Sequence, residues 1–160
     1  MSLLDVADTA GLLLAEALSD CAGYPIVPHR SSGPPAIMSC CETNDLWVWP
    51  EQVRFQQDRA GCGISKASFV AQYFLCWPQP ETAGETGGPF IPPTITDPVV
   101  GRLWQLAECG WCALIRIPCG QNGRIGDSCT GFTVDGMSWT SPSGGCVSVQ
   151  WRFSAIVACG

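Results

Sequence analysis

Basic residues are scarce in this sequence, and only one of them, Lys66, is a lysine. The 160 residues carry 8 lysines and arginines against 14 acids, so the formal net charge is −6. Proteins that bind nucleic acid gain much of their affinity from clustered bases that displace counterions from phosphates. No basic run occurs anywhere in this chain. We therefore expect no nucleic-acid binding by this chain alone.

Long apolar runs are missing as well. No stretch reaches the roughly 18 apolar residues that a membrane-spanning helix needs, so we expect no membrane partner. A signal peptide requires positive charge near its start, whereas this chain carries Asp5 and Asp8 there. The sequence therefore predicts a protein that is made and folded in the cytosol.

Catalytic patterns are also lacking, so we predict that the chain is not an enzyme and binds no cofactor. His29 is the only histidine, and neither a GxSxG motif nor a cysteine-protease signature accompanies it. The spacing Gly61-x-Gly63-x-x-Lys66 lacks the second half of a phosphate-binding loop and precedes a predicted strand. These absences favour a function that depends on contact rather than on chemistry.

The eleven cysteines are an odd number in a chain without a secretory signal, which argues against a disulfide framework. We expect most of them to pack as small apolar side chains, although some could form bridges later in an oxidising medium. Cys109 and Cys112 have thioredoxin-like spacing, but they fall deep inside a predicted helix rather than at its start. A zinc site would need Cys119 and Cys129 to complete this pair, and it stays a minor alternative.

Tryptophan is abundant while charge is low. Seven tryptophans and a charged fraction of 14%, against a usual quarter, favour a surface that is covered by a partner. Trp47 and Trp49 fall on one face of a predicted strand. Such a pair can stack on a sugar ring, but packing and subunit contact are the preferred interpretations.

Apolar periodicity predicts an α+β fold: a mostly antiparallel sheet of about five strands with two helices on one face, in the order α-β-β-β-α-β-β. A helix is expected over 2–21, followed by a loop over 22–35, and a second helix opens at Asp97-Pro98 and ends before Pro118. Pro50 should bend its strand or confine it to a sheet edge. Strands are expected over 36–40, 45–56, 66–77, 131–140 and 146–158.

Residues 78–96 form a loop rich in proline and glycine, which is long for a compact domain. A solvated loop and an arm that orders on a neighbouring protein are both open interpretations. Glu81, Glu85 and Phe90 in this loop, with Trp47 and Trp49, are the candidate residues for subunit or partner contact.

The order of short motifs resembles the tail-terminator or neck-protein family of long-tailed (siphovirus-type) actinobacteriophages. The resemblance covers nearly the whole chain, 1–160, as one tail-terminator-like domain, although each motif is short. The motifs are Leu3-Leu4-Asp5-Val6-Ala7-Asp8, Cys40-Cys41 ahead of Leu46-Trp47-Val48, Gly61-Cys62, Cys76-Trp77-Pro78 before the Pro-rich loop, and Gly144-Gly145-Cys146 before the last strand.

This resemblance implies a structural virion protein of the tail and neck. Its subunits would form a hexameric ring that caps the tail tube and joins it to the head–tail connector. The implied partners are copies of the chain, the major tail tube protein and the connector or stopper protein. DNA would pass through the ring without specific binding, which suits an acidic chain because like charge repels phosphate.

Three other interpretations stay open. A head-to-tail stopper is the nearest alternative, but stoppers tend towards a β-barrel with little helix. A carbohydrate- or receptor-binding module using the tryptophan pair is a second, and a small zinc- or thiol-dependent enzyme is a third.

Overall fold

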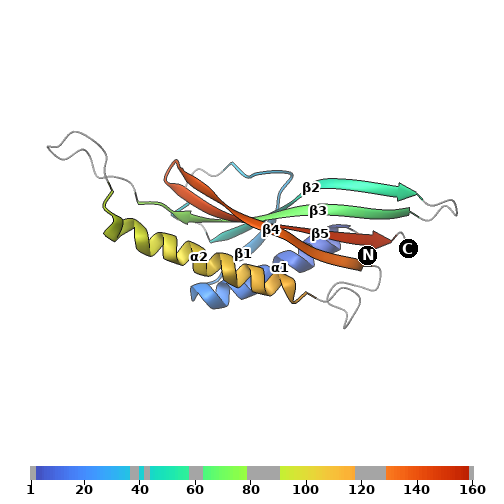
Figure 1. The fold of residues 1–160 in the computed structure, drawn as a ribbon, viewed down its shortest axis with the longest axis horizontal. Coiled ribbons are helices and arrows are strands. Elements are labelled where there is room, and N and C mark those ends of the chain that lie inside the picture. The colour runs from blue at the N-terminus through green and yellow to red at the C-terminus, as the bar shows by residue number, and fades with distance from the viewer. Residues whose placement is uncertain are drawn as a thin grey trace.

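The computed structural model describes residues 3–36, 40–41, 44–57, 63–78, 91–117 and 129–158. In these residues, two helices pack on one face of a five-stranded sheet (Figure 1). The elements are α1 (Leu3–Ala22), β1 (Val27–Arg30), β2 (Asp45–Gln57), β3 (Gly63–Cys76), α2 (Pro93–Ile115), β4 (Cys129–Ser143) and β5 (Cys146–Ala158). The expected α+β class and the expected order of elements are confirmed.

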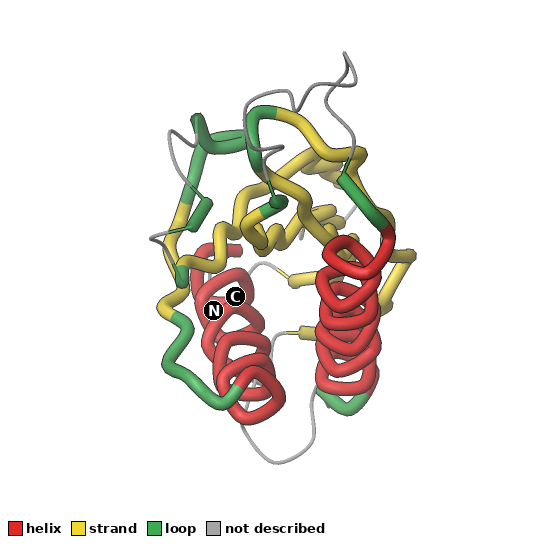
Figure 2. Tube along the Cα trace, turned by 90° about the vertical axis from the view of Figure 1, so that its left-hand side faces the viewer, coloured by secondary structure: helices red, strands yellow, loops and turns green. Residues whose placement is uncertain are grey.

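The strands lie in the order β1-β2-β3-β5-β4. Only β1 and β2 run parallel, and every other neighbouring pair is antiparallel. The strand β3 is therefore central, as its two apolar faces predict. Figure 2 shows the two layers end-on, with the helices side by side on one side of the sheet.

The core lies between the helices and one face of the sheet. In β5 the alternate residues Val149, Trp151 and Phe153 are fully buried against the helices, as the period of two in a strand requires. The helix α1 contributes residues at a regular spacing of four, which line up on one side of a helix. These are Val6, Ala10, Leu14 and Leu18, all with no exposed surface.

Helix α2 approaches the sheet most closely where Gly110 faces Trp151. A side-chain carbon built at Gly110 would lie 2.5 Å from two atoms of the Trp151 ring, so only glycine fits there. The Trp151 indole N–H donates a hydrogen bond of 3.0 Å to the carbonyl oxygen of Ala107. The buried Trp151 ring therefore connects helix α2 to β5 both by close packing and by a hydrogen bond.

The first strand was predicted in the wrong place. Val27–Arg30 is a strand, although these residues were expected in a loop. The described residues of the expected strand over 36–40, namely 36 and 40, are not in strand conformation. A four-residue strand that contains Pro28 has no readable periodicity, and Pro28 is tolerated because β1 is an edge strand.

Helix α2 also begins earlier than predicted, at Pro93 rather than at Asp97. The carbonyl oxygen of Pro92 accepts the N–H of Ile95 at 2.9 Å, which closes the first turn. Pro93 suits this position because its fixed φ matches a helix start. Pro98 then lies inside the helix, where it cannot donate the hydrogen bond that a helical N–H would make to the carbonyl oxygen of Thr94.

Pro50 lies where the sequence predicts it. The strand β1 pairs with β2 only as far as Val48, so β2 is an edge strand from there onward. The register between β2 and β3 shifts between Pro50 and Gln52, which marks a bulge. Proline and a bulge together are common at a sheet edge, where no neighbour needs the missing N–H.

The described parts of the connection between β1 and β2 pass over the sheet face that the helices leave open (Figures 1 and 2). The Ser31 N–H donates to the carbonyl oxygen of Val48 at 2.8 Å. Trp49 and Val70, which point away from the helices, are only 5% and 1% exposed, so the helix-free face is also covered at these positions. No helix among the described residues is long and apolar enough to cross a membrane.

A pair of tyrosines joins the start of β1 to the core. The hydroxyls of Tyr24 and Tyr73 lie 2.8 Å apart, and the Arg102 guanidinium sits 5.1 Å from the centre of the Tyr24 ring. Burial, and then the hydrogen bond to Tyr24, raise the pKa of Tyr73 above its usual value. Tyr73 therefore acts as a neutral hydrogen-bonding group of the core.

Candidate functional site

Trp47 and Trp49 share the sheet face away from the helices, because their neighbours Leu46 and Val48 point into the core. Trp49 is 5% exposed and Trp47 is half-buried. The His29 ring lies 5.0 Å from the Trp47 ring, and the His29 Nε2 atom is 2.7 Å from an Asp45 carboxylate oxygen. In the single chain Trp49 is thus buried and Trp47 packs against His29, so the pair offers no open platform for a sugar.

The Trp47 indole N–H is buried and has no hydrogen-bond acceptor among the described residues. Replacing a buried unpaired donor removes a desolvation cost, which offsets the lost ring area. We expect Trp47→Phe to change the free energy of unfolding by less than about 1 kcal/mol, measured by urea denaturation. Trp151→Phe is the comparison, because that indole is fully buried and hydrogen-bonded, and it should cost about 2–3 kcal/mol. Equal losses in the two variants would contradict this difference.

The loop residues of the predicted contact set lie outside the part of the chain that the structure describes. These are Glu81, Glu85 and Phe90. Their role in partner contact stays a prediction.

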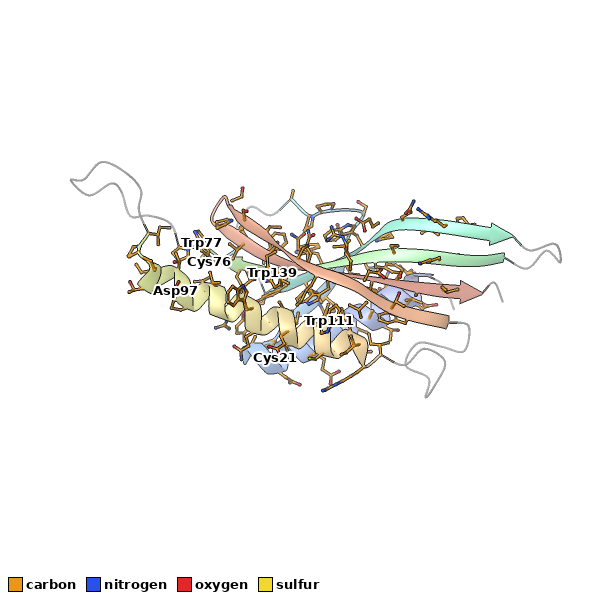
Figure 3. The ribbon with its side chains drawn as sticks, viewed as in Figure 1. Cys21, Cys76, Trp77, Asp97, Trp111 and Trp139 are labelled. Atoms are coloured by element: carbon orange, nitrogen blue, oxygen red, sulfur yellow. A yellow bond between two sulfur atoms is a disulfide. The ribbon has the colours of Figure 1, made fainter. Side chains whose placement is uncertain are left out.

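A first apolar surface lies along helix α2 and edge strand β4, and we call it the tryptophan flank: Trp104, Trp111, Ile115 and Trp139. Trp104, Ile115 and Trp139 are 62%, 55% and 45% exposed. Residues 104, 111 and 115 recur at spacings of seven and four, so they share one side of α2. Figure 3 shows Trp111 on α2 and Trp139 on β4. Exposed tryptophans in such a group are typical of surfaces that bind a protein.

A second apolar surface lies at the opposite edge of the sandwich, on α1 and β1. Leu4 and Leu12 of α1 are 49% and 60% exposed there, whereas Val27, 50% exposed, shares the helix-free face of β1 with His29. Leu12 lines a hollow of about 250 Å³ between α1 and β1. The Arg30 guanidinium binds Asp8 on its rim through two hydrogen bonds, which raise the pKa of Arg30. The two surfaces differ in shape and composition, as a head-to-tail contact between copies requires.

Three disulfides contradict the interpretation of the cysteines as free packed thiols. The first joins α1 to α2. The second joins the connection between β1 and β2 to the start of β5, and the third joins the same connection to the end of β3. The pairs are Cys21–Cys109, Cys40–Cys146 and Cys41–Cys76, with Cα separations of 6.7, 5.7 and 4.6 Å. The expectation based on the odd number of cysteines was wrong, because the fold brings distant cysteines together in pairs while it leaves Cys112 free.

The thioredoxin-like spacing does not form a redox pair. Cys109 is bonded to Cys21 of the other helix, and Cys112 is a free, half-buried thiol. No group of three or more potential metal ligands occurs among the described residues. Cys119 of the zinc alternative lies outside the described residues.

No family model and no curated protein matches this chain. The assignment of its surfaces therefore depends on the residues themselves.

The tryptophan flank was not singled out from the sequence. The apolar spacing of Leu103, Ala107, Trp111 and Leu114 predicts that Trp111 is buried, yet it is half-exposed, and the buried side of α2 includes Leu106 and Gly110 instead. The spacing of Trp104 and Trp111 by seven residues was the available signal, because it places both side chains on one side of a helix. Which side faces solvent becomes clear only once the helix is seated on the sheet.

Proposed function

We propose that this chain is a structural subunit that assembles with copies of itself, and more specifically a tail terminator of a long-tailed bacteriophage. Its ring, hexameric by the family resemblance, would cap the tail tube and join it to the connector in the neck. DNA would pass through without specific binding.

The observation that carries the self-assembly is the pair of unlike apolar surfaces at opposite edges of one sandwich. The tryptophan flank borders β4, and the surface formed by Leu4 and Leu12 of α1 borders β1. Contacts between two different surfaces repeat head to tail and close into a ring when the rotation allows it. A low charge content supports this proposal, because charged residues are depleted at the centres of interfaces.

The architecture favours a terminator over a stopper. The resemblance implies an α/β sandwich for terminators and a β-barrel with little helix for stoppers. This sheet has two open edges in the order β1-β2-β3-β5-β4, and two long helices cover one of its faces. The carbohydrate alternative loses support, because Trp49 is buried and Trp47 packs against His29.

The proposal predicts the outcome of removing the gene from the phage that encodes it. Because a terminator stops tube growth and provides the joint to the head, the deletion should give overlong tails without attached heads in negative-stain electron micrographs. Immunogold labelling of complete virions should place the chain at the neck. Tails of normal length joined to heads in the deletion, or labelling elsewhere, would overturn the assignment.

A further inference from the structure

Two basic side chains face each other across strands β2 and β3. Arg54 pairs with Lys66 in the register, and both are exposed. The adjacent pair, Val53 and Ala67, belongs to the helix-side core, so Arg54 and Lys66 lie on the helix-free face of the sheet. Like charges directly opposite each other on neighbouring strands destabilise a sheet. The isolated chain therefore bears an unfavourable contact here.

This basic pair has no ion-pair partner in the described ranges. Together with Gln52 and Ser68 it lines a hollow of about 220 Å³. Arg152, a third base on the same face, already lies 3.7 Å from the Glu51 carboxylate. Two unpaired bases are too few to hold a nucleic-acid backbone, which is bound through many phosphate contacts. The two bases instead match a small group of acidic side chains.

An acidic pair of the same kind lies on helix α1. Glu16 and Asp20 are one helical turn apart, both are exposed, and α1 contains no lysine or arginine. They line a hollow of about 410 Å³ between the two helices. Arg116 lines the same hollow but forms no ion pair with either acid within the described residues. Like charges at this helical spacing also destabilise the isolated chain.

The two pairs match in charge and in spacing. Residues directly opposite on antiparallel strands have Cβ atoms about 5 Å apart, and residues four apart on a helix have theirs about 5–6 Å apart. The bases lie on the helix-free face of the sheet, whereas the acids lie on the helix layer. The pairs therefore cannot meet within one chain, but they can meet between two copies.

We propose that Arg54 and Lys66 of one copy dock on Glu16 and Asp20 of a second copy. The β2–β3 end of the sheet projects past the ends of both helices, which gives it the reach to enter a neighbour's hollow (Figure 1). Docking relieves both like-charge contacts at once, which argues for a second copy over an unrelated acidic partner.

This inference rests on the self-assembly part of the proposed function and adds to it a second contact between copies, through surfaces other than the tryptophan flank and the α1–β1 surface. It does not depend on the location of the ring in a virion. The contact is electrostatic and partly exposed, so it should weaken as salt screens it.

The test is a charge exchange, read by light scattering over a concentration series at low and high salt. The basic-pair variant is Arg54→Glu with Lys66→Glu, and the acidic-pair variant is Glu16→Lys with Asp20→Lys. We expect the wild type to associate at low salt and each variant to associate at least about tenfold more weakly, because two attractions become repulsions. An equimolar mixture of the two variants should regain association, since each supplies the surface that the other reversed. The chain that carries all four changes should associate with itself.

A matched control separates this contact from a general effect of net charge. Arg54→Gln with Lys66→Gln lowers the net charge by the same amount as Thr94→Glu with Ser143→Asp, which alters exposed positions outside both pairs and outside the tryptophan flank. Only the first of these should weaken association. Circular dichroism should show that all variants keep the fold.

Unaltered association of the basic-pair variant, a mixture that fails to regain it, or a wild type that stays monomeric at low salt would overturn the inference. None of these results decides whether the chain sits at the neck. Conversely, charge rescue in a chain that immunogold labelling places elsewhere would support this contact and overturn the tail-terminator assignment.

Discussion

Gly110→Ala should destabilise the protein by about 2–3 kcal/mol, which is large for the addition of one methyl group. The added carbon would lie 2.5 Å from the ring of Trp151, a distance that requires something to move. The ring has no free space to enter, because Trp151 is fully buried and its indole N–H is fixed to the Ala107 carbonyl oxygen. Helix α2 would have to lift from the sheet or the ring would have to leave its rotamer. Urea denaturation monitored by tryptophan fluorescence measures the loss.

The same substitution at Gly101 is the matched control. Gly101 lies in the same helix, is exposed, and has open space where the methyl group would be placed. Alanine has the higher helix propensity, so Gly101→Ala should be neutral or stabilising by up to about 1 kcal/mol. If Gly110→Ala proved as mild as Gly101→Ala, the close packing of α2 on Trp151 would be wrong.

Removal of the bridge between the helices should have an effect of similar size. The Cys21–Cys109 disulfide closes a loop with a sequence separation of 88 residues, and cross-links of long loops restrict the unfolded chain most. We expect Cys21→Ser with Cys109→Ser to lower the free energy of unfolding by about 2–4 kcal/mol in non-reducing buffer. In the presence of a reductant, the variant and the wild type should unfold at nearly the same denaturant concentration.

Cys112→Ser serves as the control for this pair, because Cys112 is a free thiol in the same helix and should change stability little. Mass spectrometry of the alkylated, unreduced protein gives an independent check. It should find Cys21 and Cys109 protected and Cys112 modified. A double variant with wild-type stability in non-reducing buffer would show that the bridge does not form.

The sequence predicts the elements of this fold better than their starts. The alternation in β5 extends over a whole strand with one buried face, so the predicted strand over 146–158 agrees with the structure. The predicted start of helix α2 lies four residues too late, because Asp97-Pro98 and Pro92-Pro93 both resemble a helix start. Local chemistry alone does not decide between two such signals. The four residues of β1 are too few to show any period, and only their pairing with β2 makes them a strand.

The candidate site was less predictable, because it depends on what the fold brings together. Trp47 and Trp49 do share a face, as alternation requires, but the burial of Trp49 depends on how the chain folds around that face. The pairing of Cys40 with Cys146 spans 106 residues, and no spacing rule in a single sequence indicates it. Likewise, Arg54 and Lys66 become neighbours only through the register of β2 and β3.

The position of β5 in the sheet has a consequence for biosynthesis. It is the last strand in the sequence, yet it lies between β3 and β4 and pairs with β3 from Ile64↔Ala158 to Cys76↔Cys146. A ribosome that has released β1, β2, β3 and α2 therefore holds a nascent chain whose central strand lacks one neighbour and whose longer helix lacks Trp151. Pairings so distant in sequence form slowly, because loop closure must precede them. The sheet is therefore completed only after translation of its final strand, and until then β3 presents an apolar open edge that a chaperone can bind.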